Sequence, residues 1–235
     1  MIIKGFIGTT LIDYPGHIAT TVFTAGCHFR CPYCYNVDLV LRPGALPTLD
    51  NDQVLFDIGN RVGFIDGVVV TGGEPTEQKG LGDFLGSVKA FGLKVKIDTN
   101  GHEPTVLHSL VERDVLDFIS MDFKGPPDRY AEIVRAPMEW SRIEQSLSLV
   151  LKHHHKSEVR TTLHPKLHSR DDLVEMGKVL GPEISWSWQP VYPAPTLDPD
   201  FQVEEGEELD QFRTTLLEWS KSFPNVRVSG LPPGM

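Results

Sequence analysis

The sequence is poor in cysteine, in long apolar runs and in positive charge. Only three of its 235 residues are cysteine, and an odd number within one short loop is not a disulfide framework. Uninterrupted apolar runs such as Val68-Val69-Val70 are far shorter than the ~20 residues that span a bilayer. Residues 1–16 lack the basic start and apolar centre of a secretory signal. We therefore expect a cytoplasmic protein with no membrane partner.

The chain is acidic. Lys and Arg number 22 against 32 Asp and Glu, which gives a formal net charge of −10. Nucleic acid is not expected as a partner, because binding its phosphates requires a basic surface. With 40% hydrophobic and 23% charged residues the chain can bury a sizeable core. Its length favours one domain over residues 1–235, with a short N-terminal extension at 1–17 and a C-terminal helix and tail at 200–235.

Short β-branched runs alternate with segments of helical spacing. The predicted strands are Ile18–Phe23, Gly67–Thr71, Lys94–Thr99, Phe118–Asp122, Glu158–Leu163 and Ile184–Gln189. The predicted helices are Asp52–Val62, Leu81–Phe91, Pro104–Arg113, Trp140–His153, Arg170–Leu180 and Glu204–Phe223. This alternation predicts an α/β fold with parallel strands joined by crossover helices.

Six strand–helix units are too few for a closed eight-stranded barrel, so an open partial barrel and a doubly wound sheet both fit. The segment before the first of these strands, Ile2–Tyr14, is a candidate short hairpin closing the sheet edge. Asp13-Tyr14-Pro15-Gly16 has the composition of a turn.

The three cysteines, Cys27, Cys31 and Cys34, all lie within eight consecutive residues. Thiolates are soft ligands that suit iron–sulfur clusters, zinc or copper. Four-iron clusters usually take four cysteines, so three would leave one iron open to substrate. His28 could complete a zinc site, but ligands adjacent in sequence are not the usual zinc spacing. We favour an iron–sulfur cluster over zinc and over three buried structural cysteines.

Two further motifs follow predicted strands. In Thr71-Gly72-Gly73-Glu74-Pro75-Thr76 the glycines allow close backbone approach, and Glu74 could accept hydrogen bonds from an ammonium group. A tight turn would also explain this run. Asp98-Thr99-Asn100-Gly101 ends the next strand and has the signal of an Asx turn.

Polar residues also mark the ends of the later strands. Asp122-Phe123-Lys124 could be a solvated ion pair, but a buried aspartate at a strand end is costly unless it is paired or binds something. Arg160 and Gln189 are further candidates for the same face. His153-His154-His155 reads as a solvated helix end, and a lone histidine such as His164 is more often structural.

These residues resemble the radical S-adenosylmethionine (SAM) enzymes. Cys27-x-x-x-Cys31-x-Tyr33-Cys34 is similar to their cysteine signature, and the run at 71–75 is similar to their methionine-binding motif. The segments at 98–101 and 122–124 resemble the activating enzymes of glycyl radical enzymes. Within that branch, the segments at 13–16 and 121–130 resemble anaerobic ribonucleoside-triphosphate reductase activating proteins. The resemblance runs over most of residues 1–190.

The resemblance implies an open partial (β/α)6 barrel of the radical SAM type. It implies that Cys27, Cys31 and Cys34 hold a 4Fe-4S cluster whose fourth iron binds SAM. The other implied SAM-binding residues are Tyr33, Gly72, Gly73, Glu74, Asp98, Asp122 and Lys124, with Arg160 and Gln189 as further candidates. A monovalent cation at Asp98 and Asp122 is a further candidate cofactor.

The implied function is that of an activating enzyme. A flavodoxin, a ferredoxin or a similar one-electron donor reduces the cluster, SAM is cleaved to a 5′-deoxyadenosyl radical, and a glycyl radical forms on a partner protein. The chain departs from many activators by carrying Tyr35-Asn36 after the third cysteine, and Gln189 or Tyr192 stands where some carry a histidine. Two alternatives remain: a small-molecule enzyme such as a 7-carboxy-7-deazaguanine synthase acting on a pterin with Mg, and an iron–sulfur electron carrier or redox sensor.

Overall fold

The structure, a computed structural model, describes residues 1–232 and contains two compact units. The first unit comprises residues 1–28 and 38–120, and the second comprises residues 29–37 and the chain from Met121 onward. The boundaries fall inside the cysteine segment, between residues 37 and 38, and inside strand β5 (Phe118–Asp122). The single domain expected from the sequence stays a prediction, and residues 233–235 of its tail lie outside the described part.

Four strands of the first unit follow one another in hydrogen-bonded order. Strand β1 (Ile3–Thr10) is antiparallel to β2 (Ala19–Thr24), and β2, β3 (Gly67–Gly72) and β4 (Lys94–Thr99) are parallel. The β-branched run of β3 is fully buried at Val68 to Val70, as expected for a strand covered on both faces. Within the segment predicted as a hairpin, Ile2–Tyr14, only Ile3–Thr10 is a strand, and it pairs with β2 rather than with a second strand of the same segment.

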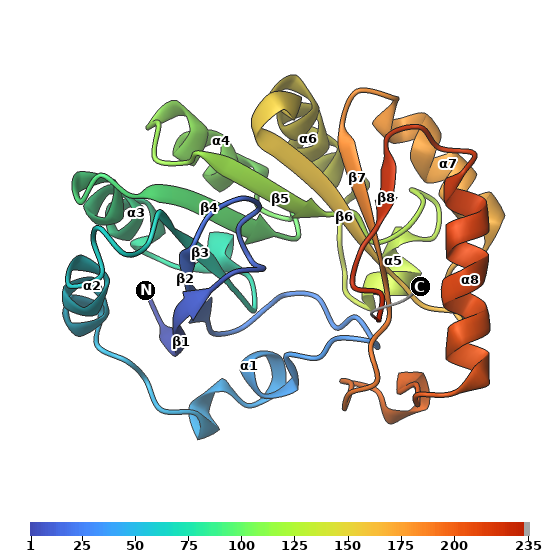
Figure 1. Cartoon of the computed structure of the whole chain (residues 1–235), viewed down its shortest axis with the longest axis horizontal. Coiled ribbons are helices and arrows are strands. Elements are labelled where there is room, and N and C mark those ends of the chain that lie inside the picture. Colours follow the sequence, from blue (N-terminus) through green and yellow to red (C-terminus); the bar gives the residue numbers. More distant parts are fainter. Residues whose placement is uncertain (233–235) are drawn as a thin grey trace. The chain divides into compact units, whose positions relative to one another are not determined.

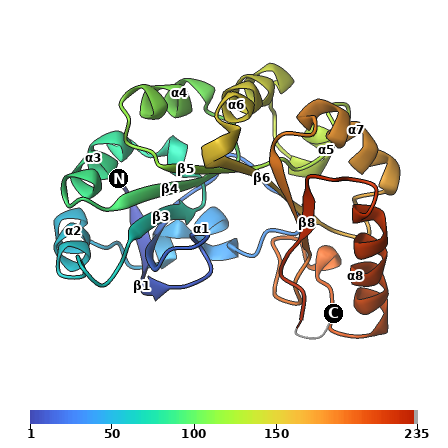
Figure 2. The same ribbon diagram turned by 45° about the horizontal axis from the view of Figure 1, so that its top comes forward.

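Helices alternate with the parallel strands of the first unit along the chain. The helices are α1 (Val37–Leu41), α2 (Asn51–Gly59), α3 (Leu81–Ala90) and α4 (Pro104–Glu112), with 3-10 turns η1 (Pro43–Ala45) and η2 (Pro75–Glu77). Figures 1 and 2 show α2 and α3 side by side next to β3 and β4. Asp50 starts α2 by accepting the amide of Gln53 over 2.9 Å.

The second unit repeats the strand–helix pattern. Strands β6 (Ser157–Leu163), β7 (Ser185–Pro190) and β8 (Val226–Val228) are parallel. The helices are α5 (Tyr130–Val134), α6 (Trp140–Lys152), α7 (Arg170–Leu180) and α8 (Glu207–Ser220), with 3-10 turns η3 (His154–Lys156) and η4 (Pro199–Phe201). The fully buried Trp186 and Trp188 meet edge to face, with ring centroids 5.3 Å apart, at the core of this unit.

All six predicted strands and all six predicted long helices are present, which confirms the α/β class. The sequence did not predict β8, α1 or α5, each of five residues or fewer. Three to five residues are too short to display a hydrophobic period.

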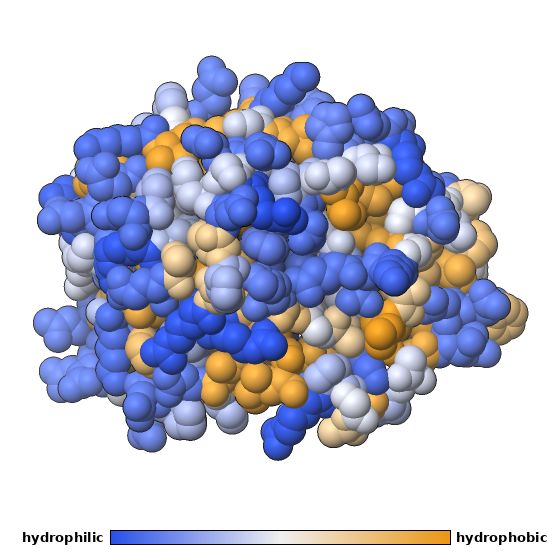
Figure 3. Space-filling view, turned by 180° about the vertical axis from the view of Figure 1, so that it is seen from behind, coloured by the Kyte–Doolittle hydropathy of each residue, from blue (hydrophilic) through white to orange (hydrophobic). Residues whose placement is uncertain are grey.

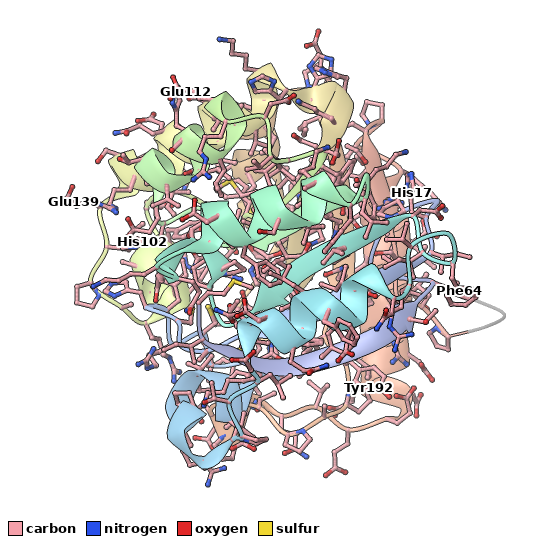
Figure 4. The ribbon with its side chains drawn as sticks, turned by 90° about the vertical axis from the view of Figure 1, so that its left-hand side faces the viewer. His17, Phe64, His102, Glu112, Glu139 and Tyr192 are labelled. Carbon is pink, nitrogen blue, oxygen red and sulfur yellow. The ribbon has the colours of Figure 1, made fainter. Side chains whose placement is uncertain are left out.

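The parallel register gathers the chemistry-bearing segments of the first unit at one end. Thr24, the last residue of β2, lies opposite Gly72, the last residue of β3, and the cysteine segment and the Gly-Gly-Glu run begin just beyond them. In Figure 4, His102, which follows β4, lies at the opposite end of this unit from His17 and Phe64.

The surface is chemically mixed. The face in Figure 3 carries hydrophilic residues interspersed with small hydrophobic patches. None of the helices within residues 1–232 is long and apolar enough to cross a membrane.

Candidate functional site

The Gly-Gly-Glu run packs directly on the residue before Cys27. A Cβ on Gly73 would lie 1.7 Å from the carbonyl oxygen of Gly26, so no other side chain fits there. Gly72 has a φ of 119°, a conformation that favours glycine. The amide of Glu74 donates to the same Gly26 carbonyl over 2.7 Å. Both glycines are therefore required by the close approach of this turn to the start of the cysteine segment.

Glu74 is buried, and its carboxylate joins the ends of β3 and β4. Oε1 accepts from the Thr76 amide at 3.0 Å, the Thr76 hydroxyl at 2.5 Å and the Thr99 hydroxyl at 2.7 Å. Oε2 accepts from the Asn100 amide at 2.7 Å. Burial raises the pKa of Glu74 to about 7, and these hydrogen bonds oppose the rise. Among residues 1–232, the Asn100 amide is the one donor to Oε2, so a lone pair of this oxygen can accept from a further donor such as an ammonium group.

Asn100 is a site residue that the sequence reasoning assigned only to a turn. Its Oδ1 accepts the His102 amide over 2.8 Å, which is the Asx turn expected as the alternative. Its Nδ2 also donates to Sγ of Cys27 over 3.6 Å. Hydrogen bonds to cysteine sulfur are among the factors that set the reduction potential of iron–sulfur clusters. The Asn-Gly pair gave the turn, but no sequence signal gave the contact with sulfur.

Asp98 forms an ion pair with a lysine of its own strand, β4. The Nζ of Lys96 lies 2.5 Å from Oδ1 of Asp98, and the Lys96 side chain is buried. The sequence reasoning missed Lys96, although its place two residues before Asp98 in the predicted strand Lys94–Thr99 puts the two side chains on one face.

In the second unit Cys31 and Cys34 flank a buried tyrosine. The amide of Cys34 donates to the Cys31 carbonyl over 3.1 Å, which places the two residues in one turn. Burial raises the pKa of the Cys31 thiol to about 11, and nearby Lys124 acts in the opposite direction. Burial also raises the pKa of Cys34. A bound metal would take the proton's place on these buried thiols.

Tyr33 presents its ring to the interior of the second unit. It is 4% exposed, and within residues 1–232 its hydroxyl has no hydrogen-bond partner. Its ring meets that of His168 edge to face, with centroids 6.3 Å apart. Burial raises the pKa of Tyr33 well above its ordinary value, so the phenol stays neutral.

Asp122, Lys124 and Arg160 form one ion-paired cluster. Nζ of Lys124 lies 3.2 Å from Oδ2 of Asp122, and Nη2 of Arg160 lies 3.1 Å from Oδ1. Burial alone would raise the pKa of Asp122, but the two cations outweigh it and hold the pKa below its usual value. The structure therefore adds Arg160, which the sequence offered separately, to the Asp122–Lys124 pair.

The remaining residues singled out in the sequence are Gln189 and the histidines. Gln189 lies opposite Thr162 in the β6–β7 register, on the strand face that also carries Arg160. His164 is structural, as expected: its Nδ1 accepts the Lys166 amide at 3.0 Å, and its Nε2 lies 2.9 Å from the Phe201 carbonyl oxygen. His154 and His155 are exposed just after α6, as expected for a solvated helix end.

The chemistry of the cysteine segment fits an iron–sulfur cluster as the bound group. Three thiols are concentrated in one segment, and the first of them accepts an amide hydrogen bond from Asn100. The roles of the individual residues toward these groups stay predictions.

Comparisons with known proteins agree with this chemistry. The sequence matches the family model described as the Radical SAM superfamily over residues 21–177, two thirds of the chain. A candidate glycyl-radical enzyme activating enzyme of Methanocaldococcus jannaschii is 29% identical over 86% of this chain and 84% of its own length.

Two relatives that match over a shorter part of the chain are named for two different activities. A pyruvate formate-lyase-activating enzyme of Clostridium pasteurianum is 36% identical over 50% of each chain. A 7-carboxy-7-deazaguanine synthase of Rhodospirillum rubrum is 37% identical over 37% of this chain and 36% of its own.

The fold recurs in solved structures. SuiB of Streptococcus suis, bound to S-adenosylmethionine, superposes with a TM-score of 0.60 at 14% identity. The match covers 88% of this chain and 49% of SuiB, so the chain spans about half the length of that protein. This likeness confirms the expected open α/β fold of the radical SAM type. The chain belongs to the radical SAM superfamily, whose enzymes use a 4Fe-4S cluster and S-adenosylmethionine.

Proposed function

We propose that this enzyme activates a glycyl radical enzyme, and that its partner is an anaerobic ribonucleoside-triphosphate reductase. The observation that carries the proposal is the Asn100–Cys27 contact, because it joins the first cysteine to the polar end of β4 beside the Gly-Gly-Glu turn. The similarity to the activating enzyme of Methanocaldococcus jannaschii over most of both chains supports the activating branch.

In the proposal Cys27, Cys31 and Cys34 ligate the cluster and leave one iron for SAM. When bound, the cluster and SAM supply a 5′-deoxyadenosyl radical after one electron arrives from a flavodoxin, a ferredoxin or a similar donor. The protein's contribution is to hold SAM in one orientation and to keep water away.

Residues of the first unit hold the methionine part of SAM. Gly72 and Gly73 carry no side chains, so the ligand can approach the backbone of the turn closely. Glu74 accepts a hydrogen bond from the SAM ammonium group through the second lone pair of Oε2. Asp98 orients the same part and is itself held by Lys96.

Tyr33, Asp122 and Gln189 are the other contacts that we propose for the ligand. Tyr33 lies along the adenine, since its buried neutral ring offers an apolar face. Asp122 orients the methionine part, with Lys124 and Arg160 fixing its carboxylate. Gln189 shares the face of Arg160 and contacts the nucleoside.

The substrate hydrogen is on a glycine Cα of the partner protein. The peptide radical left behind is delocalised over two flanking amides, so transfer to a primary carbon radical runs downhill. The partner's glycine loop must reach van der Waals contact with the SAM 5′ carbon and shield it from water.

A second candidate is a 7-carboxy-7-deazaguanine synthase-like activity on a small molecule. The match to the Rhodospirillum rubrum enzyme favours it, although that match covers only 37% of this chain.

SAM cleavage tests the proposal. Dithionite-reduced, reconstituted protein should form 5′-deoxyadenosine slowly alone and faster with an anaerobic reductase. Acceleration by a purine or pterin, with no response to any glycyl radical enzyme, would favour the small-molecule activity. Absence of 5′-deoxyadenosine in the presence of a full cluster would favour an electron carrier.

A further inference from the structure

Cys31 lies between two residues that are anchored to other parts of the second unit. On one side the Arg30 amide donates to the carbonyl of Val134, at the end of α5, over 2.8 Å. On the other side the Pro32 carbonyl accepts the Asp198 amide over 3.0 Å.

The segment after β7 holds the cysteine turn at two more points. The Leu197 amide donates to the Cys34 carbonyl over 3.0 Å. The Tyr192 amide donates to the Tyr35 hydroxyl, and the two rings meet edge to face. Residues 192–198 thus run along the cysteine segment as a strap.

Arg135 connects the end of α5 to this strap. Its Nη1 lies 2.5 Å from Oδ2 of Asp198, and its guanidinium lies 4.9 Å from the centre of the Phe201 ring. The pKa of Asp198 is held below its usual value by the hydrogen bond from Arg135 and by the Asp200 amide. The chain of contacts Arg30–Val134, Arg135–Asp198 and Asp198–Pro32 closes a ring around Cys31.

The backbone of Arg135 is in the left-handed region, with φ 48° and ψ 47°. A residue with a side chain adopts this conformation under steric strain, which glycine would avoid. Within residues 1–232 the only other non-glycine residue with a positive φ is Asp114, at 53°. The position tolerates a strained backbone while its side chain reaches Asp198.

We propose that the Arg135–Asp198 ion pair is a positioning clamp for the cysteine segment, which holds Cys31 and Cys34 at the spacing that the cluster requires. Neither residue touches the cluster: each acts through the backbone of Arg30 and Pro32. The inference rests on the proposed assignment of these cysteines as cluster ligands.

Hydrogen exchange in the cluster-free protein tests the clamp without any cofactor. Replacing Arg135 by Gly removes the ion pair with Asp198 and relieves the strain of the left-handed backbone. If Arg135 served only to end α5, glycine would serve equally well and hydrogen exchange would not change. We expect the amides of Leu197 and Asp198 to exchange roughly threefold to tenfold faster, since the pair is partly exposed and screened. Asp114→Gly is the matched control and should leave both amides unchanged.

Iron release tests the consequence for the cluster. In reconstituted protein under anaerobic conditions, an excess of a ferrous chelator should remove iron from Arg135→Gly roughly threefold to tenfold faster than from the wild type. Arg135→Lys keeps the charge but lacks the planar fork, so its rate should lie in between. Lys178→Ala, which breaks the exposed ion pair with Glu175 in the same unit, should match the wild type.

Wild-type exchange at Leu197 and Asp198 in Arg135→Gly would overturn the clamp, as would equal acceleration by Asp114→Gly. If Arg135→Gly fails to give a cooperative thermal transition, Arg135→Lys decides: wild-type iron release in that variant overturns the proposal. Failure of the wild type to cleave SAM would count against the proposed function and would leave the exchange result unaffected.

Discussion

The backbone amide of Asn100 donates to Oε2 of Glu74 over 2.7 Å, and this bond ties the end of β4 to the end of β3. The same Asn100 donates through its side chain to the sulfur of Cys27. A cysteine, a buried carboxylate and a strand end are thereby fixed to one another inside the first unit. Changes at Glu74 should therefore be felt both in ligand binding and at Cys27.

Glu74→Gln should weaken SAM binding and remove its pH dependence. Burial raises the pKa of Glu74 to about 7, so the carboxylate that accepts the SAM ammonium is mostly protonated at pH 6 and mostly charged at pH 8. Wild-type affinity should rise about tenfold between these pH values. At pH 8 the variant should bind on the order of tenfold to a hundredfold more weakly, since a charge-assisted bond to a buried group is lost.

Calorimetric titration of reconstituted protein measures this. Glu77→Gln is the matched control, because Glu77 lies in the same turn and its Oε1 accepts the His28 amide, which a Gln carbonyl can also accept. Wild-type affinity and an unchanged pH profile in Glu74→Gln would remove Glu74 from the SAM site.

Gly73→Ala should disrupt the turn before any ligand is bound. The new Cβ would lie 1.7 Å from the backbone oxygen of Gly26, and backbone cannot yield as a flexible side chain can. We expect a loss of about 3 kcal/mol or more in unfolding free energy, or failure to fold. Gly86→Ala is the control, because Gly86 lies inside α3 with open space around its Cα and should gain about 0.5–1 kcal/mol. Equal denaturation midpoints for the two variants would contradict the packing of Gly73 on Gly26.

The strands could be predicted closely because their β-branched runs are bounded by turn residues. Lys94–Thr99 and Phe118–Asp122 have the bounds that the sequence indicates. Strand β8 could not be predicted, because Val226–Val228 is too short to show alternation and acquires its structure by pairing with β7. The segment Ile2–Tyr14 was predicted as a hairpin because its composition does not show whether a strand there pairs within the segment or with the next strand, β2.

The sequence indicates which residues are candidate ligands, but it does not indicate the contacts that hold the site residues in place. The clustering of Cys27, Cys31 and Cys34 is visible in the sequence, since those positions lie close together. The bond between Glu74 and Asn100 joins residues 26 positions apart, and Asp198 reaches Pro32 from still farther along the chain. Such contacts depend on strand register and loop path, which no local pattern specifies.

SAM binding should not depend on sodium or potassium in the wild type. Asp98 already has the ammonium group of Lys96 at 2.5 Å, so a monovalent cation is not required at that carboxylate. In Lys96→Met the carboxylate loses this partner, and we expect SAM affinity to become sensitive to replacement of sodium by bulky choline. Calorimetry in the two salts measures this. A wild-type enzyme that loses SAM binding in choline would show that a cation does join Asp98 and Asp122.

Asp172→Asn should destabilise the second unit at neutral pH. Burial raises the pKa of Asp172, but hydrogen bonds from Ser169 and Arg129 outweigh it and hold the pKa below its ordinary value. A carboxyl with a lowered folded pKa contributes stability above its unfolded pKa and loses it as pH falls through the folded value. The substitution should therefore cost roughly 1–3 kcal/mol at pH 7 and progressively less in acid.

Thermal or urea unfolding of the cluster-free protein at pH 7 and at acid pH measures this difference. Asp171→Asn, at the neighbouring exposed position in the first turn of α7, is the control. An Asp172→Asn penalty that stays constant from neutral pH into acid would contradict the role of the charged carboxylate.

Isotope transfer measures whether the hydrogen comes from a protein glycine. The reconstituted enzyme, SAM and a reductant are mixed anaerobically with an anaerobic ribonucleoside-triphosphate reductase whose glycines carry deuterium on Cα. We expect deuterium in the 5′-deoxyadenosine, and, with unlabelled reductase, a doublet electron paramagnetic resonance signal on the partner. Unlabelled 5′-deoxyadenosine and no doublet with any glycyl radical enzyme, while a deuterated purine or pterin passes its label during turnover, would contradict a glycine donor.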